Sequence, residues 1–331
     1  MTMVHASPSG GHLLSIADLD RDGLLEHLEA AEAFGEVERR SVRKVPTLKG
    51  KVVASLFFEE STRTRLSFET AAKRLSADVL SLAVASSSVK KGESLRDTVE
   101  TIEAMGIDAV VLRHRSAGAP AQVARWVGRA RVINAGDGAH EHPTQALIDL
   151  VTVRQALCER EGRAAEGSGL APFEGREVLI IGDIRHSRVA RSQILAYSLA
   201  GASVRVAAPG TLLPSSLEGW PVEVVEDLDE ALATCDVASV LRMQEERGSG
   251  SFVPSLHEFT ATYGMTAARA SLLKEGAVIT HPGPMVRGVE IASAVADDPR
   301  CLVRRQVSNG VPVRMAALFL ALAGPEGDAH D

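Results

Sequence analysis

KVVASLFFEESTRTRLSFETAAKRLSADVLSLAV, residues 51–84, is the stretch that decides the fold class of this chain. It begins with an apolar run at 51–58 that is typical of a buried strand. Apolar residues then recur with helical spacing over 65–77, and a second strand-like run follows at 78–84. A strand, a helix and a strand in this order predict a βαβ unit and therefore a parallel sheet.

The same alternation of short apolar runs and helical patterns extends over most of the chain. It predicts an α/β protein with two doubly wound parallel-sheet domains. A polar stretch with four glycines, at 160–176, separates the two sets of elements and is interpreted as a loop or linker. The helix expected at 311–324 is apolar on most of its circumference and should be buried. The remaining elements are expected as strands at 108–113, 131–137, 177–183, 203–209, 236–243 and 277–284, and as helices at 94–105, 144–159 and 189–200.

Composition excludes several classes of protein. The 331 residues are 45% hydrophobic and 24% charged, as in an ordinary globular protein, and the formal net charge of −7 argues against a nucleic-acid partner. No apolar run approaches the roughly 20 residues that span a bilayer, and the N-terminus lacks the pattern of a secretory signal. Three isolated cysteines, Cys158, Cys235 and Cys301, form neither zinc-like pairs nor a disulfide framework. We therefore expect a cytoplasmic protein without membrane contact, in which the cysteines are small buried apolar residues.

The turn between the first strand and its helix is unusually rich in donors. Ser61, Thr62 and Thr64 alternate there with Arg63 and Arg65. The simpler interpretation is a helix cap with solvated arginines, but a cap requires only one such hydroxyl. Because a helix N-terminus favours negative charge, hydroxyl and guanidinium donors at this point indicate a site for a phosphate-like anion.

Other polar motifs in the first half also follow predicted strands. LRHR, residues 112–115, places Arg113 at a strand end, where it can point into a cleft. The segment 134–150 places His142 beside a proline and Gln145 on the first turn of a helix. A metal site at His140 and His142 is disfavoured, because no third ligand follows at a suitable spacing. The lysine-containing loop SSSVKKGES, residues 86–94, is by itself interpreted as an exposed loop.

The second half repeats this arrangement with more arginines. GDIRHSRVARS, residues 182–192, has a single glycine after its strand, which excludes the dinucleotide fingerprint GxGxxG. THPGPMVRG, residues 280–288, has prolines that fix the backbone and carbonyls that can accept hydrogen bonds from a ligand amide. Together the motifs predict a cleft for two small anionic substrates, one of them a phosphate ester or anhydride. Its arginines in this half are Arg185, Arg188 and Arg191, with Arg242 and Arg247 beside Gln244.

These motifs resemble the carbamoyltransferase family, in order and over nearly the whole chain, from about residue 13 to residue 323. The matching segments are FFEESTRTRLSFE, KKGES, LRH, HPTQALIDL, GDIRHSRVARS, RMQEER and HPGPMVRGVEI. The second half is similar to the family members that use aspartate: the ornithine enzymes have a cysteine-containing HCLP turn where this chain has HPGP. They also lack the paired arginines of SRVARS and RMQ. One departure is Met285, where some relatives have arginine, so that no charged side-chain role is expected there.

The resemblance implies a reaction. The α-amine of L-aspartate attacks the carbonyl carbon of carbamoyl phosphate, giving N-carbamoyl-L-aspartate and phosphate, an early committed step of pyrimidine biosynthesis. No cofactor is implied, because the phosphate leaving group is already activated, and catalysis rests on positioning and charge stabilisation. Two alternatives remain open: a carbamoyltransferase for ornithine or another amine, and a non-catalytic relative that binds a phosphometabolite or serves as a scaffold.

The resemblance also assigns roles to individual residues. The catalytic residues it implies are Arg63, Thr64, Arg113 and His142, with Arg63 stabilising the leaving group and the others surrounding the carbamoyl oxygen. The carbamoyl phosphate site is implied to comprise these four with Ser61, Thr62, Gln145, Gly283 and the carbonyl of Pro284. The aspartate site is implied to comprise Lys91, Arg188, Arg242 and Gln244. Glu59 is expected to bridge to Arg188 and Arg247 on domain closure, and Arg65 to support the turn by ion pairing.

The resemblance further implies a domain division and an assembly. A carbamoyl-phosphate-binding domain is expected at 1–143 plus 305–331, with the final helix packing back on it, and an aspartate-binding domain at 144–304. A loop with Ser87 and Lys91 is expected to enter the active site of a neighbouring subunit, which implies a homotrimer with shared sites. A larger assembly with dihydroorotase or regulatory chains is also compatible with this pattern.

Overall fold

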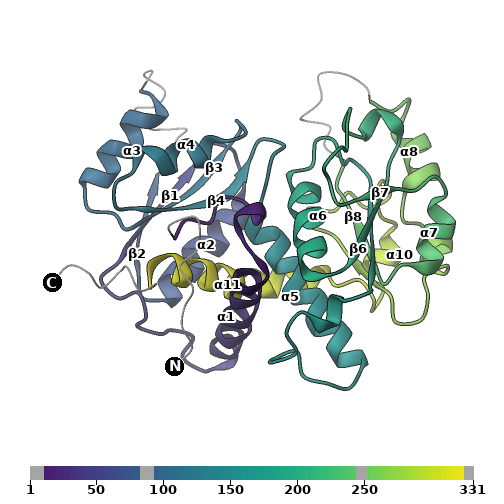
Figure 1. Ribbon diagram of the computed structural model, residues 1–331, viewed down its shortest axis with the longest axis horizontal. Helices are drawn as coiled ribbons and strands as arrows, with labels where there is room; N and C mark the ends of the chain where they lie inside the picture. The colour runs from purple at the N-terminus through teal and green to yellow at the C-terminus, as the bar shows by residue number, and fades with distance from the viewer. Residues whose placement is uncertain (1–10, 83–92, 244–251, 324–331) are drawn as a thin grey trace. The chain divides into compact units, whose positions relative to one another are not determined.

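The computed structural model describes residues 11–82, 93–243 and 252–323 (Figure 1). The chain divides into two compact units: unit 1 comprises Met1–Leu147 and Asn309–Asp331, and unit 2 comprises Ile148–Ser308. Both divisions fall within helices, α5 (Pro143–Arg160) and α11 (Val303–Leu322). Of the two interpretations of 160–176, loop or linker, the loop is confirmed: after the end of α5 the stretch is irregular apart from the short 3₁₀ helix η4 (Ala171–Phe173), and it lies inside unit 2 and does not connect the units.

Unit 1 contains a four-stranded parallel sheet. Its strands are β1 (Val52–Phe57), β2 (Asp78–Leu82), β3 (Ala109–His114) and β4 (Arg131–Asp137), in the order β2-β1-β3-β4. The chain builds the sheet outward from β1 to β2 and then crosses to β3 on the other side. The order in which strands are added therefore changes direction between β1 and β3, although the two strands are parallel. The carboxyl ends of β1 and β3 flank the position at which doubly wound sheets bind ligands.

Helices cover both faces of this sheet (Figure 1). On one face, alternate strand residues such as Leu56 and Leu112 pack against α3 (Leu95–Ala104) and α4 (Ala119–Trp126). On the other face α2 (Thr62–Arg74) buries Phe68, and the Arg314 guanidinium of α11 lies 5.1 Å from the Phe68 ring centroid. Helix α1 (Arg21–Arg39), preceded by η1 (Ile16–Asp18), contacts α11 through Phe34 and Phe319. The part of α11 from residue 309 onward therefore belongs to unit 1, as predicted.

Unit 2 contains a five-stranded parallel sheet in the order β7-β6-β5-β8-β9. The order in which strands are added changes direction between the parallel strands β5 and β8. One face carries a core in which Leu179, Ala238 and Ile279 pack with residues of α7 and α9. On the other face, the buried Gln193 amide of α6 donates to the Ser239 hydroxyl of β8 at 2.9 Å. The elements are β5 (Glu177–Ile181), α6 (Arg188–Ala200), β6 (Ser203–Ala207), η5 (Gly210–Leu212), β7 (Glu223–Val224), α7 (Leu228–Thr234), β8 (Val237–Val240), α8 (Leu256–Tyr263), α9 (Ala267–Ala270), β9 (Val278–Thr280) and α10 (Ser293–Ala296).

The predicted α/β fold with two parallel, doubly wound sheets is confirmed. Two helix starts differ from the prediction by more than one residue: α2 begins at Thr62 rather than at 65, and α11 begins at Val303 rather than at 311, with Pro312 inside it. Cys158 and Cys235 are buried as expected, whereas Cys301 is only half-buried against the core of unit 2. Within the described residues, none of the helices is long and apolar enough to cross a membrane.

Candidate active site

Two polar motifs in each unit lie at the carboxyl ends of the two neighbouring strands between which the strand order changes direction, and the motifs at 134–150 and 280–288 follow the edge strands β4 and β9. In unit 1, residues 58–65 follow β1 and Arg113 lies at the end of the adjacent β3. In unit 2, residues 182–188 follow β5 and Arg242 follows the adjacent β8. The sequence motifs therefore coincide with the positions at which open parallel sheets bind ligands, one set in each unit.

The turn after β1 is built to receive an anion. Ser61 occupies the N-cap position of α2, yet in the described structure its hydroxyl accepts no capping hydrogen bond from the helix. The first turn of α2 contains no acidic residue, so that the positive end of the helix is not neutralised from within the helix. Arg63 is exposed, while the side chain of Thr64 is buried. Nε of Arg65 lies 3.8 Å from Oε1 of Glu69, which agrees with the expected ion pairing of Arg65.

Arg113 is held beside this turn by Glu59. Its Nη2 donates to Oε1 of Glu59 at 2.8 Å and its Nη1 donates to the Ala135 carbonyl at 3.2 Å. The guanidinium is buried, and a buried charge requires such partners. Glu59 thus pairs within unit 1 in this structure, whereas its bridges to Arg188 and Arg247 on closure stay a prediction.

A second guanidinium that the sequence analysis did not single out contributes positive charge in the same unit. Arg314 of α11 is buried, and its Nη1 donates to Oγ of Ser67 and to the Gly310 carbonyl, both at 3.0 Å. Burial, and then the charge of Arg113, lower the pKa of Arg314 to about 9. The group remains a cation at neutral pH. Burial is the larger cause of this pKa shift and repulsion between the two cations the smaller one, and a bound anion would offset that repulsion.

His142 and Gln145 lie at the start of α5. Pro143 is the first helical residue, a position suited to its fixed φ. The N–H of Gln145 donates to the His142 carbonyl at 2.9 Å, and the His142 side chain is buried. The two residues are therefore one turn apart at the N-terminal end of a helix. Asp137 and Glu141, which precede His142, take part in a network of hydrogen bonds that includes residues near the N-terminus.

The arginines of unit 2 differ sharply from one another. Arg188 is the first residue of α6 and is only 2% exposed, with Ser187 capping the helix through the Ala190 N–H at 3.1 Å. Arg185 and Arg191 instead lie over aromatic rings, 5.5 Å from the Phe252 centroid and 4.5 Å from the Trp220 centroid. Arg188 is therefore the only one of these three arginines that is buried.

The HPGP turn is fixed by a buried histidine. Nδ1 of His281 accepts from the Gly283 N–H at 2.8 Å, so its Nε2 carries the proton and donates to Oε1 of Glu290 at 3.1 Å. The Glu290 carboxylate also accepts from the Val286 N–H at 2.6 Å. Both side chains are essentially inaccessible to water. The Gly283–Pro284 peptide is cis. Glu290 was not recognised as a support from the sequence.

Four predicted site residues, Ser87, Lys91, Gln244 and Arg247, lie outside the described residues. The others lie where the motifs placed them, at strand ends and helix starts. Met285, for which no charged role was expected, packs against the core of unit 2.

Comparison with known families identifies the two units. Residues 11–155 match the family model described as "Aspartate/ornithine carbamoyltransferase, carbamoyl-P binding domain". Residues 174–321 match "Aspartate/ornithine carbamoyltransferase, Asp/Orn binding domain". The chain belongs to the aspartate/ornithine carbamoyltransferase family. The resemblance inferred from the sequence motifs is thereby confirmed.

Individual carbamoyltransferases are similar over nearly the full length. The aspartate carbamoyltransferase catalytic subunit of Parafrankia sp. (strain EAN1pec) is 54% identical over 313 residues, covering 95% of this chain and 97% of that protein. The subunit of Thermobifida fusca (strain YX) is 53% identical over 313 residues, covering 95% and 96%. Among solved structures, aspartate transcarbamoylase from Trypanosoma cruzi in complex with carbamoyl phosphate matches with a TM-score of 0.81 at 31% identity, covering 95% and 97%. The catalytic subunit of M. Jannaschii aspartate transcarbamoylase matches with a TM-score of 0.78 at 34% identity, covering 96% and 100%.

Proposed function

We propose that this protein transfers the carbamoyl group of carbamoyl phosphate to the α-amine of L-aspartate, giving N-carbamoyl-L-aspartate and phosphate. The observation that carries this proposal is the similarity, over 95% of the chain, to relatives named aspartate carbamoyltransferase catalytic subunit. The strand-end arginines of both units support it, because both substrates are anions. This carbamoyl transfer would be an early committed step of pyrimidine biosynthesis.

Unit 1 supplies all but one of the groups that would bind carbamoyl phosphate, and the exception is the backbone at Gly283–Pro284, in unit 2. Ser61, Thr62 and Thr64, with the N-terminal end of α2, would donate hydrogen bonds to the phosphate oxygens. Arg63 would stabilise the negative charge that grows on the leaving phosphate as the C–O bond breaks. Arg113 and His142, with Thr64, would donate to the carbamoyl oxygen as attack of the amine makes it an oxyanion. Gln145 and the backbone at Gly283–Pro284 would accept from the carbamoyl NH₂.

Unit 2 supplies the groups that would bind aspartate. Arg188 and Arg242 would each hold one carboxylate of the substrate, a planar anion that a guanidinium fork matches with two parallel hydrogen bonds. Gln244 and Lys91, outside the described residues, are proposed to complete this site. Catalysis would then consist of holding the amine against the carbonyl carbon and stabilising charge, because the leaving group is already activated.

The acceptor amine decides between this proposal and its alternatives. We expect carbamoyl transfer to L-aspartate to exceed transfer to ornithine or N-acetylornithine at least a hundredfold, since about 2.7 kcal/mol of discrimination is within reach of one paired carboxylate. Product formation from each amine with carbamoyl phosphate, measured side by side, gives the answer. Ornithine as the preferred acceptor would overturn the roles of Arg188 and Arg242. Phosphate binding without turnover of any amine would indicate a non-catalytic relative.

We further infer a homotrimer with shared active sites in the cytoplasm. Ser87 and Lys91 match the family loop that completes a neighbour's site, and the three cysteines are unpaired thiols. The native mass should be three times the 35.1 kDa of the chain. Light scattering of the purified protein checks this, and repeating it with dihydroorotase or regulatory chains tests a larger assembly. An active monomer would contradict the shared site.

A further inference from the structure

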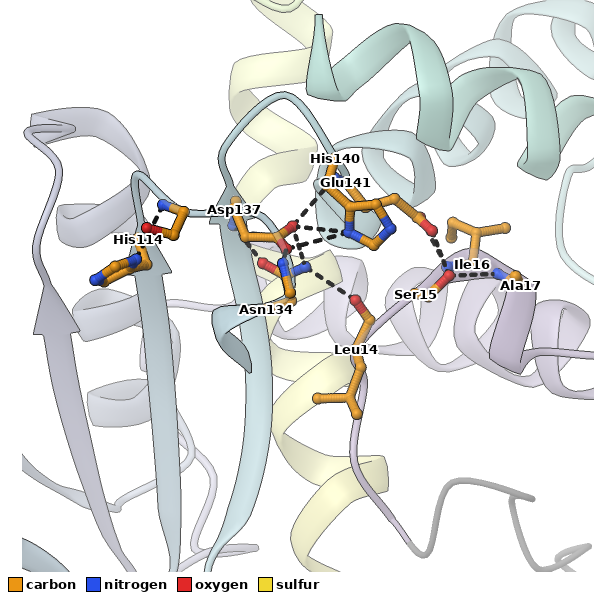
Figure 2. A network of polar contacts seen from close by, with 12 residues as sticks. Leu14, Ser15, Ile16, Ala17, His114, Asn134, Asp137, His140 and Glu141 are labelled. Atoms are coloured by element: carbon orange, nitrogen blue, oxygen red, sulfur yellow. Dashed lines mark hydrogen bonds and ion pairs between the residues drawn. The ribbon is translucent and has the colours of Figure 1, made fainter. Parts of the chain in front are cut away.

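A network of polar contacts lies directly before the turn that carries His142 (Figure 2). It connects three segments of unit 1: residues 13–17 near the N-terminus, the carboxyl end of β3, and residues 134–141 at the end of β4. Its two central carboxylates, Asp137 and Glu141, are 1% and 2% exposed. Buried carboxylates must be compensated by donors, so the arrangement of these donors constrains the turn.

Glu141 binds the N-terminal segment. Oγ of Ser15 donates to Oε1 of Glu141, and the N–H of Ile16 donates to Oε2 at 3.0 Å. The same segment is paired with β4: the N–H of Leu13 donates to the Val132 carbonyl at 2.9 Å, and the Leu13 carbonyl accepts from the N–H of Asn134 at 2.9 Å. The segment thus extends the sheet beside its edge strand, and Glu141 is attached to it by both carboxylate oxygens.

Asp137 closes the other side of the turn. Oδ1 of Asp137 accepts from the Asn134 amide at 2.9 Å and from the N–H of Glu141 at 3.1 Å, and Oδ2 accepts from the N–H of Gly118 at 2.6 Å. His140 Nδ1 lies 3.1 Å from Oδ2 (Figure 2). Burial acts to raise the pKa of Asp137, but the hydrogen bonds from His140, Asn134 and Gly118 outweigh it and hold that pKa below its ordinary value. The carboxylate is therefore ionised at neutral pH, and the donors remain bound to it.

The turn also packs tightly against the end of β3. The N–H of Gly138 donates to the His114 carbonyl at 2.9 Å. A Cβ at Gly138 would lie 2.8 Å from the backbone nitrogen of Ala117, so this position admits glycine alone. The network therefore includes the chain neighbours of both proposed catalytic groups of unit 1: His114 follows Arg113, and Glu141 precedes His142.

We propose that Glu141 is a positioning residue for carbamoyl transfer: attached to Ser15 and Ile16, it fixes the backbone from which the His142 side chain projects. The inference rests on the proposed function, in which His142 donates to the carbamoyl oxygen. Its physical basis is that rotation of this carboxylate would leave buried donors unpaired, at a cost of about 1–3 kcal/mol each. Misplacement of a catalytic group by about 1 Å can lower the rate about a hundredfold, so such an attachment affects catalysis directly.

Two substitutions at one position test this role. Glu141→Ala should lower kcat at least about tenfold while the KM for aspartate changes less than about threefold, because the misplaced group acts on the carbamoyl oxygen. Glu141→Gln should restore kcat to within about threefold of wild type, since its Oε1 can accept from the Ile16 N–H and its Nε2 can donate to Ser15 Oγ. Steady-state kinetics with each substrate varied in turn, and the thermal midpoint of each variant, provide the measurements.

Glu103 provides a matched control. Its carboxylate also accepts from backbone N–H groups, those of residues 128–130, but it does so at the opposite end of β4. Glu103→Ala should lower the thermal midpoint without lowering kcat more than about twofold, because it removes the same kind of contact far from the turn. If Glu141→Ala lowers kcat no more than Glu103→Ala does, Glu141 has no positioning role.

The failure of this inference is distinguishable from failure of the proposed function. Wild type inactive with aspartate would contradict the function itself. An active wild type, an impaired His142→Ala and an unimpaired Glu141→Ala would contradict only the positioning role. If Glu141→Ala does not fold, Ser15→Ala removes a single hydroxyl from the same contact and should lower kcat about two- to fivefold, in line with one lost hydrogen bond. An unchanged kcat in Ser15→Ala would then overturn the inference.

Discussion

Arg63→Ala should lower kcat at least about a hundredfold, a loss of about 2.7 kcal/mol of transition-state stabilisation. The reason is the charge that develops on the phosphate as it leaves. Hydroxyl donors can bind that phosphate in the ground state, but only a cation at this position offsets the charge that grows in the transition state. Because the Arg63 side chain is exposed and its backbone is helical, its removal should leave the fold intact.

The neighbouring Arg65 offers a matched control on the same helix. It is exposed like Arg63, and its Nε lies 3.8 Å from Glu69. Arg65→Ala should therefore change kcat less than about twofold, because an exposed pair of this kind contributes about 0.3–0.5 kcal/mol to stability and nothing to the reaction. Steady-state kinetics and circular dichroism of both variants test the contrast. A loss below tenfold in Arg63→Ala would remove the leaving-group role.

Local patterns were sufficient to predict most of the fold. The β-branched runs became strands, β4 at its predicted bounds, and each polar motif follows the carboxyl end of a strand. Helix α2 begins earlier than expected because Thr62 to Thr64 are helical and belong to its first turn, which the apolar spacing alone did not indicate. Helix α1 was not predicted, although Leu24, Leu28 and Ala31 recur with helical spacing and are buried. These errors concern where one helix begins and whether another exists, and they leave the predicted class of fold unchanged.

The supports of the site were not predictable from local patterns. Glu141 meets Ile16 across 125 residues of chain, and Arg314 meets Ser67 across 247. A glutamate before a histidine looks the same in the sequence whether it faces solvent or a buried amide. Likewise, the sequence shows three similar arginines in SRVARS and its preceding loop, and only packing distinguishes buried Arg188 from the ring-stacked Arg185 and Arg191. Contacts between distant segments decide these roles, and periodicity carries no information about them.

The burial of Arg188 leads to the second prediction with a large expected effect, which concerns the binding of aspartate. Arg188→Lys should raise the KM for aspartate about ten- to a hundredfold. Lysine keeps the charge and can still donate one hydrogen bond, but it loses the second of the two parallel bonds of the guanidinium fork, and one such bond to a charged group contributes about 1.5–3 kcal/mol. The KM for carbamoyl phosphate should change less than about threefold, since the residues proposed to bind its phosphate belong to unit 1. Lysine is preferable to alanine here because Arg188 is buried, and alanine would also leave a cavity.

Arg191 lies three residues further along α6 and provides a matched control. Comparing the two lysine variants distinguishes a role of Arg188 in binding aspartate from a general effect of positive charge on this helix. The Arg191 guanidinium lies over the Trp220 ring, so Arg191→Lys removes the same fork from the same helix without altering a carboxylate site. Its KM for aspartate should stay within about twofold of wild type, because the half-buried contact of this guanidinium is with a ring and not with a substrate carboxylate. Initial rates over a range of aspartate concentrations at saturating carbamoyl phosphate measure both variants. Equal rises in KM for the two would mean that α6 contributes only a diffuse positive field, and a normal KM in Arg188→Lys would place the substrate carboxylates elsewhere. A rise confined to Arg188→Lys would assign one carboxylate of aspartate to the buried guanidinium at the start of α6.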